Sequence, residues 1–501
     1  MLIFRSIQIR IIKQRTYFIM NKIIKNIFAA GLLTLSISAL AQERTAYNLG
    51  GTSFRHEFNP ALQPTCKVYI NLPAISNLDF NIRNSFGLFD LIQYNDENNK
   101  DAGKKLDFDL LASVLNNDNS FSTRQNINLL GFGFKVKKLY FHFGSSLIND
   151  MRLSYPDDIL TIRNGFFDIE STTPTVVDLS NIALDINTYA EISLGASYTD
   201  VIPGLTVGGK LKYLRGIMNM NTAKSTFQIT TNPVDYSMSA TIDYAFEGAF
   251  PIAVNMVNGV PKVEPTIEDA NGAIEYLKTG GNNGFAVDLG ATYKLKEKFT
   301  FGLSILDLGA IKWGNQVQSL NAKFDYKFEG FVLNADSMMS GDKDANGDSY
   351  IDRQVNKVTD EIQTKLDNAF STTDIESYST GLPTRVFLSA NYQALKWLNV
   401  GFLSRNEFYK SKFHPGATLS VNVLPIRQVA ASLSYSVFDN SAANVGAGLA
   451  LRLGPLQFYT VTDNFISFIQ PQNARNAYVR FGFNLMFGCK PKKEGQSLIS
   501  Q

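Results

Sequence analysis

The sequence predicts an all-β protein, a transmembrane outer-membrane β-barrel of about 14 antiparallel strands. Three observations support this prediction. Segments of about 9–13 residues repeat a strict apolar–polar alternation, and a tilted strand needs this length to cross a bilayer. An export signal stands near the start of the chain, and no later apolar run reaches the ~18 residues of a spanning helix. Glycine (36), phenylalanine (37) and tyrosine (21) are abundant, as in β-rich proteins.

The alternation is clearest between Asn476 and Gly488. Every odd position in this stretch is apolar, and the even positions are mostly small or polar, with Met486 as the exception. A period of two means a β-strand with two different environments. We expect the apolar face to touch lipid, and Arg480 and Asn484 to face the lumen.

Other segments repeat this pattern. They are 190–198, 205–213, 236–246, 285–295, 417–423, 429–437 and 445–453. Their second face is mostly Gly, Ser, Thr, Asn, Lys or Asp, which suits a polar lumen inside a lipid-facing wall. A soluble β-protein is the alternative, but it needs two such sheets packed together. Short turns (199–204 and 296–298) contrast with long polar stretches, as in membrane barrels. The long stretches are 92–125, 251–283 and 334–383.

The N-terminus predicts export. A basic start, an apolar run and Ala39-Leu40-Ala41 before Gln42 form a secretory signal, complete from Met20. The predicted organisation follows the chain from end to end. Residues 1–41 are the signal peptide with Met20 as the true start, 42–125 an N-terminal plug and the first strands, 126–488 the transmembrane barrel, and 489–501 a polar tail.

Two polar insertions also contain helical periodicity. Residues 106–115 and 358–370 each place apolar side chains on one helical face. We expect these helices to cap or plug the barrel.

Composition and motifs argue against an enzyme and against nucleic acid as a partner. Net charge is +2, from 47 basic and 45 acidic residues, with no dominant charge block. The three histidines, His56, His142 and His414, accompany no recognisable catalytic spacing. On the alternation of its own strand, we expect His142 to face the lumen. No cofactor is predicted, apart from a calcium ion considered next.

One polar stretch, 341–352, has oxygen side chains at alternating positions, which a calcium ion requires. The candidate ligands are Asp342, Asp344, Asn346, Asp348 and Asp352. A register that starts at Asp342 places Arg353 where the last carboxylate belongs, and one that starts at Asp344 places Val355 there. Neither register is complete, so a weak calcium loop and an ordinary turn-rich surface loop both remain open.

The two cysteines, Cys66 and Cys489, form an even pair in an exported chain, which suggests a disulfide. If residues 67–72 are the first barrel strand, antiparallel closure against the last strand brings both cysteines to the same rim. If the residues near Cys66 belong to the plug, the cysteines need not meet.

Three stretches carry a resemblance to a known family: Phe58–Pro73, Ser304–Trp313 and Gly381–Gln393. They resemble a bacteroidete-type family of outer-membrane β-barrel proteins of unknown function, itself similar to long-chain fatty-acid transporter barrels. Asn59-Pro60-Ala61 is similar to the start of the plug in those transporters. The resemblance implies a 14-stranded barrel with an N-terminal plug and no catalytic residues. It also implies diffusion of a hydrophobic compound through a lateral opening.

The sequence therefore favours a barrel in the cell outer membrane that passively transports a hydrophobic or amphipathic small molecule. The alternative is a structural or assembly barrel that docks a protein partner in secretion or surface organisation. Outer-membrane lipid is an expected partner in both interpretations.

Overall fold

The molecule is described from a computed structural model. It describes residues 43–94, 103–164, 172–250, 252–257, 260–265, 275–276, 280–296, 298–331, 334–339, 343–344, 348–410, 412–438, 441–471 and 474–489. The predicted signal peptide and most of the polar tail therefore lie outside the described residues.

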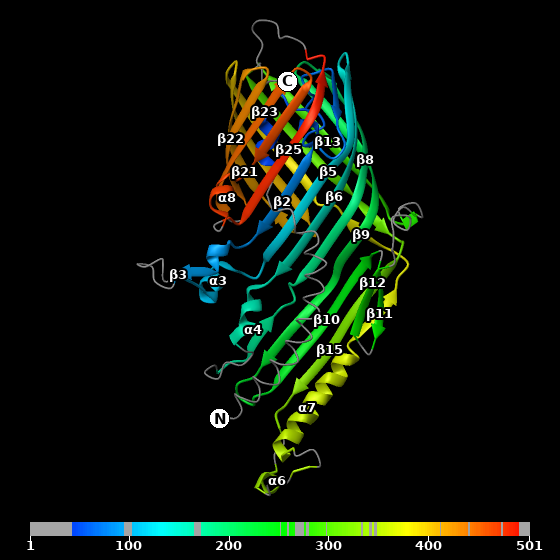
Figure 1. Cartoon of the computed structure of the whole chain (residues 1–501), viewed down its shortest axis with the longest axis vertical. Coiled ribbons are helices and arrows are strands. Elements are labelled where there is room, and N and C mark those ends of the chain that lie inside the picture. The colour runs from blue at the N-terminus through cyan, green and yellow to red at the C-terminus, as the bar shows by residue number, and fades with distance from the viewer. Residues whose placement is uncertain are drawn as a thin grey trace.

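Fourteen antiparallel strands close into a barrel (Figure 1). In chain order the wall consists of β1 (Val68–Asn71) continued by β2 (Leu78–Asn84), β5 (Asn119–Val136), β6 (Leu139–Tyr155), β8 (Ala183–Thr199), β9 (Leu205–Thr231), β13 (Asn283–Leu295), β14 (Phe299–Trp313), β18 (Thr384–Leu395), β19 (Leu398–Tyr409), β21 (Gly416–Ile426), β22 (Val429–Phe438), β23 (Ser441–Leu453), β24 (Leu456–Thr462) and β25 (Asn476–Phe487). The ring closes because β1 and β2 pair with both β5 and β25. Closure leaves no strand edge unpaired.

The two faces of the wall differ as the sequence predicts. In β25, Arg480 and Asn484 are 1% exposed, whereas Phe483 and Phe487 are at least 40% exposed. Leu211 in β9, at 67% exposure, shows the same outward placement of apolar side chains. Large apolar side chains therefore cover the outside, and polar ones fill the inside.

The first wall strand is interrupted between β1 and β2. Residues 72–77 lie opposite just two residues of β25, Gly482 and Phe483. The Ser76 carbonyl accepts a hydrogen bond from Tyr459 Oη at 2.7 Å, so the loop bends into the barrel. A side chain at Gly482 would collide with the Ser76 backbone, which explains the glycine there. Sequence reasoning considered 67–72 as one possible first strand and did not find this break.

Short turns join the strands at one end of the barrel, here called the turn end, and long segments leave from the other. Strand β9 continues past the wall, where β10 (Met238–Ala249), β15 (Val317–Phe328) and β16 (Phe370–Asp374) extend it into a projecting sheet (Figure 1). The segment 236–246 therefore lies in this sheet and not in the fourteen-stranded wall, because strands outside the ring share the period of two.

Helix α7 (Tyr350–Asp367) packs on the projecting sheet. Its Ile362 and Leu366 contact the cluster formed by Phe324 and Tyr326 of β15. The helix predicted at 358–370 is therefore present, but it covers β15 and does not plug the barrel. Its apolar face finds a sheet to cover, which the sequence pattern alone does not specify.

The smaller elements lie between these strands. They are α2 (Arg44–Asn48), η1 (Phe54–Glu57), η2 (Leu88–Asp90), β3 (Ile92–Tyr94), β4 (Lys104–Leu106), α3 (Phe108–Val114), η4 (Asp157–Leu160), α4 (Thr161–Asn164), β7 (Thr175–Asp178), β11 (Ile252–Val257), β12 (Val260–Pro265), α6 (Ala335–Met339), β17 (Tyr378–Gly381), β20 (Lys412–His414) and α8 (Ile466–Ile469). Among the helices in the described part of the chain, none is long and apolar enough to span a membrane.

Candidate functional site in the barrel lumen

Residues 43–66, called here the inner segment, lie against the inward-facing side chains of the wall. Helix α2 is buried along its whole length. The apolar side chains of the segment pack in one cluster with wall residues Phe387, Leu403 and Tyr459. The segment supplies to that cluster Ala46, Tyr47, Leu49, Phe54, Phe58 and Leu62.

Hydrogen bonds fix the start of the inner segment. The backbone N–H groups of Arg44 and Thr45 donate to the Asp463 carboxylate at 2.8 and 2.6 Å. The hydroxyls of Tyr47 and Ser389 lie 3.1 Å apart on the β18 side of the wall. The two bonds to Asp463 satisfy N–H groups at the start of α2 that have no partner within the helix and would otherwise be costly to bury.

The end of the inner segment is fixed by hydrogen bonds to β8, β13 and β14. Asn59 Nδ2 donates to the carbonyls of Ala291 and Leu303, in β13 and β14, at 3.3 and 3.2 Å. Gln63 Nε2 donates to the hydroxyl of Ser197 in β8 at 3.1 Å. Asn59 belongs to the Asn-Pro-Ala stretch, so this motif positions the segment against the neighbouring strands β13 and β14.

Glycines in the wall make room for that motif. A Cβ atom on Gly208 of β9 would collide with the Pro60 carbonyl, and one on Gly290 of β13 would collide with the Asn59 side chain. The inner segment and the wall therefore approach each other to backbone contact distance at both positions.

We predict that Gly208→Val displaces the Asn59-Pro60 stretch from the wall. Overpacking of this kind costs about 1–3 kcal/mol. Limited proteolysis of the folded barrel should then cleave the inner segment faster than in the wild type. The matched control is Gly209→Val on the same strand, where a Cβ atom meets ordinary contact distances near 3.7 Å. Equal proteolysis of both variants would show that the close approach does not hold the segment.

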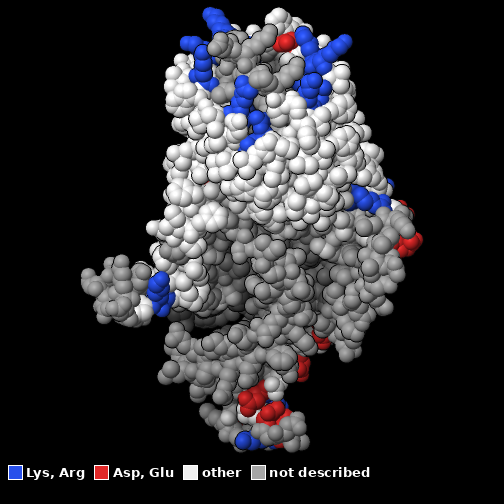
Figure 2. Space-filling model, turned by 45° about the horizontal axis from the view of Figure 1, so that its top comes forward, with Lys and Arg blue, Asp and Glu red and all other residues white. Residues whose placement is uncertain are grey.

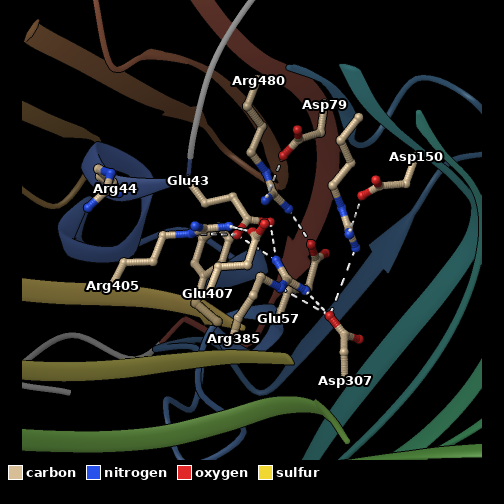
Figure 3. Close-up of polar contacts among 12 residues, drawn as sticks. Glu43, Arg44, Glu57, Asp79, Asp150, Asp307, Arg385, Arg405, Glu407 and Arg480 are labelled. Carbon is tan, nitrogen blue, oxygen red and sulfur yellow. Dashed lines mark hydrogen bonds and ion pairs between the residues drawn. The ribbon is translucent and has the colours of Figure 1, made fainter. Parts of the chain in front are cut away.

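Ion pairs cross the lumen around Glu43 (Figure 3). Arg385 Nη1 lies 2.5 Å from the Glu43 carboxylate, and its Nη2 lies 2.6 Å from Asp307. Arg405 Nε lies 3.7 Å from Glu43 on another side. The wall extends these contacts through Arg83, Arg124, Asp150, Arg152, Glu191, Lys210, Lys212, Asp288 and Glu407.

Asp307 has a strained backbone at the centre of these pairs. Its φ is 61°, a left-handed conformation that side-chain-bearing residues rarely adopt. Its N–H donates to the Asp288 carboxylate at 2.8 Å, and its own carboxylate contacts Lys212 and Arg385. The surrounding charges therefore stabilise a conformation that the backbone alone disfavours.

A second group of charges surrounds Arg480 of β25. Its guanidinium forms an ion pair with Glu57 of the inner segment and lies 3.3 Å from Asp79 of β2. It also lies over the rings of Phe54 and Phe58, 4.5 and 4.8 Å from their centroids. Arg480 therefore holds the segment by charge and by aromatic contact together.

The wall and the inner segment complement each other in charge. In the ion pairs just described the wall supplies eight basic and six acidic side chains. The segment supplies Glu43 and Glu57, which bring the two signs to equal number. Buried charges require partners, so these two carboxylates complete the ion pairs of Arg385, Arg405 and Arg480.

His56 of the inner segment contacts the wall as a neutral imidazole. Its Nδ1 donates to the Ser53 carbonyl at 2.8 Å, so Nε2 accepts from Tyr69 Oη at 3.1 Å. The ring centroid of His142 lies 4.5 Å away, and His142 faces inward as predicted. Burial lowers the pKa of His56 to about 4. A buried imidazole is easier to keep neutral than charged.

We predict that the inner segment is held less firmly as pH falls. Burial would raise the pKa of Glu43, but Arg385 and Arg405 lower it to about 2, from 4.5 when the segment is released. The free energy by which Glu43 holds the segment is complete above pH 4.5 and lost towards pH 2. The free energy by which His56 holds the segment falls by up to about 3 kcal/mol between pH 6.5 and 4, because only the released form takes up a proton in this range.

The measurement is protease cleavage of the inner segment between pH 7 and 4, with a protease active throughout. His56→Gln should remove the part of this change that protonation of His56 causes. A cleavage rate that does not vary with pH in the wild type would contradict the prediction.

Two cavities border the inner segment. The central cavity measures about 50 Å³, and its segment residues are Glu43, His56 and Glu57. Polar wall residues such as Asn126 and Lys212 line the rest. A larger cavity of about 310 Å³ opens towards the turn end, between residues 61–64 and the wall. The central cavity has room for a few water molecules at most.

Cys66 and Cys489 form a disulfide in the structure, with their Cα atoms 4.0 Å apart. Tyr69, Tyr140 and Met486 pack around it. Cys66 ends the inner segment, two residues before β1 begins at Val68. It therefore belongs to the inner segment and still lies at the rim beside the last strand. The bond joins the beginning and the end of the barrel wall at the turn end.

The candidate calcium loop is described in part. Asp342 and Asn346 lie outside the described residues. Asp344 Oδ1 accepts the Asp348 N–H at 2.9 Å, and Asp352 accepts the Ser349 N–H at 3.0 Å, as part of the α7 cap. Within the described residues, no group of three His, Cys, Asp or Glu could hold a metal.

Calcium binding by this loop stays a prediction. A terbium titration of the purified protein should show luminescence that calcium displaces. Asp344→Ala combined with Asp348→Ala should abolish that signal. The same luminescence in this variant and the wild type would remove the loop as a site.

Sequence reasoning located part of this lumen. Arg480, Asn484 and His142 face inward as predicted. It did not single out Glu43, Asp307 or Arg385, although strand alternation places the charged positions of β14 and β18 on the inner face. His414 lies in the short strand β20, beyond the end of β19.

The sequence profile of a family of unknown function, DUF5723, matches residues 60–463, most of the chain. The chain belongs to this family. The match includes the Asn-Pro-Ala stretch from Pro60 onward and most wall strands. No curated protein matches this DUF5723 chain in sequence.

Solved outer-membrane barrels resemble this DUF5723 protein at low identity. The toluene transporter TodX of Pseudomonas putida is 9% identical over 89% of this chain and 97% of its own, with a TM-score of 0.36. The toluene transporter TbuX of Ralstonia pickettii is 9% identical over 90% and 99%, with a TM-score of 0.40. The monoaromatic hydrocarbon channel CymD is 8% identical over 88% and 98%, with a TM-score of 0.34.

Proposed function

We propose that this protein is a gated, passive channel in the outer membrane of a Gram-negative, bacteroidete-type bacterium. The observation that carries the proposal is the position of the inner segment, which supplies Glu43 and Glu57 to the charges of the lumen wall. The segment is held by these polar contacts beside its apolar cluster, and polar contacts can be exchanged for water more easily than a dry apolar core. We therefore assign it the role of a plug.

The proposed cargo is an amphipathic small molecule. Polar and charged residues line most of the central cavity, so a wholly apolar compound would lose the solvation of those groups without replacing it. An amphipathic molecule can satisfy them with its polar part. The apolar outer surface of the wall suits the lipid environment from which such a molecule would come.

The route passes the central cavity and requires movement of the plug. At about 50 Å³ the cavity is too small for a typical organic ligand. Asn71 at the end of β1 and Asn128 of β5 line it beside the interrupted strand. We propose this interruption, residues 72–77, as the lateral connection to the membrane.

The test is native mass spectrometry on protein purified from outer membranes in mild detergent. We expect a bound small molecule that denaturation releases. A barrel without any bound small molecule, followed by no uptake of amphiphiles into vesicles that contain it, would reject the channel.

A second candidate function rests on the projecting sheet. Strands β10, β15 and β16 with α7 form an ordered surface beyond the wall (Figure 1). Such a surface could dock a secretion or surface protein. A second protein in the same mass spectra, lost when residues 334–369 are deleted, would favour docking.

A further inference from the structure

The turn-end cavity of about 310 Å³ has a distinctive charge. Four basic side chains line it: Arg55 of the inner segment, Lys135 of β5, Lys294 of β13, and Lys298 in the following turn. Among the described residues, Asp200 is its one carboxylate, and it lies 3.7 Å from Lys138 Nζ. The lining is therefore strongly cationic.

The wall strands bring these groups together by register. Lys294 follows Thr292 at the next inward position of β13, and both line the cavity. Thr206 of β9 and Thr300 of β14 add hydroxyl groups from the two neighbouring strands. Arg55 Nε donates to the Tyr47 carbonyl at 3.2 Å, which fixes its position. Cations interleaved with hydroxyl donors are the groups that bind oxyanions.

More basic side chains surround this cavity without lining it. Exposed Lys137, Lys296, Lys396 and Arg427 lie in the turns between wall strands. Figure 2 shows several Lys and Arg side chains gathered around this end of the molecule, with few acidic ones between them. A field of one sign around a partly enclosed cavity concentrates ions of the opposite sign inside it.

We propose that the turn-end cavity binds a phosphate group, carried by a small solute or by a lipid headgroup. Several cations facing one cavity suit a group with about two negative charges and several acceptor oxygens. The inference rests on the proposed channel for its role, as the site where an anionic cargo enters or leaves. Binding itself requires no transport.

Isothermal titration calorimetry on the full-length protein in uncharged detergent tests the site. The two probes are glycerol 3-phosphate and dihexanoylphosphatidylglycerol, with glycerol as the neutral control. Lys135→Gln combined with Lys294→Gln removes two cations from the cavity. Lys137→Gln combined with Lys296→Gln removes the same charge from the same two regions outside it, and is the matched control.

We expect the cavity variant to bind the phosphate probe at least about tenfold more weakly than the wild type. The affinity of the control variant should change by less than about twofold. Lys135→Arg with Lys294→Arg should retain binding, which separates loss of charge from loss of folding. Binding of glycerol 3-phosphate identifies a solute site, and binding of the lipid alone identifies a headgroup site. Equal weakening in both Gln variants, or no binding of either probe by the wild type, overturns the proposal.

The binding and channel results are independent. A barrel that binds phosphate but never conducts would leave this site standing and reject the channel. A barrel that conducts but binds neither probe would support the channel and reject the phosphate site.

Discussion

The double substitution Glu43→Gln with Glu57→Gln should release the inner segment and convert a closed barrel into a conducting one. Each substitution leaves buried guanidinium groups short of a partner, and such a loss costs about 3–5 kcal/mol. We expect the low end of this range, because Asp307 still pairs with Arg385 and Asp79 with Arg480. About 3 kcal/mol corresponds to a roughly hundredfold rise in the open population for each substitution.

Planar-bilayer recordings measure this change directly. The matched control is Asp118→Asn with Glu329→Gln, which alters net charge equally at side chains that are 59% and 72% exposed. The control should remain closed. If the lumen variant also remains closed and its segment stays protected from protease, the charges do not hold the plug. A segment that is released without any conductance would instead reject the channel.

Cys66→Ser should produce the second large effect, a loss of barrel stability. The disulfide connects residues separated by 423 positions, so its loss frees a very long loop in the unfolded chain. In the chain-entropy account this amounts to about 6 kcal/mol. Urea unfolding followed by the gel mobility of unheated samples should show a lower midpoint for the variant.

Two comparisons identify the cause of that loss. Cys66→Ser with Cys489→Ser should match the single variant, and reducing agent should lower the wild-type midpoint to the same value. Non-reducing mass mapping should find the Cys66 and Cys489 peptides joined. Two free thiols in protein from outer membranes, or a midpoint insensitive to reductant, would contradict the prediction.

The regular part of the wall could be predicted from the sequence. Each strand carries its own alternation, and the turns at 199–204 and 296–298 follow directly from local composition. The same local rule misplaced 236–246, because a strand in a sheet outside the ring also has two different faces. Period two identifies a strand but not the ring to which it belongs.

The lumen could not be predicted in the same way. Asp307 meets Arg385 only after the ring has brought β14 and β18 together. Glu57 reaches Arg480 across 423 positions, and the inner segment itself has no alternation to identify its partners. The interrupted strand at 72–77 depends on one glycine of β25 and on contacts with Ser76. Such pairings depend on register around the closed ring, which no single stretch encodes.

Closure of the ring has a consequence for biogenesis. Val68 of β1 pairs with Phe487 of β25, so the first and last wall strands must find each other. Contacts this distant in sequence form slowly. A chain that ends before β25 would leave β24 and the first strand with unpaired edges in the membrane, where water cannot satisfy them. Premature termination even a few residues before Asn476 should therefore yield a product that is degraded, although thirteen of its fourteen wall strands would be present.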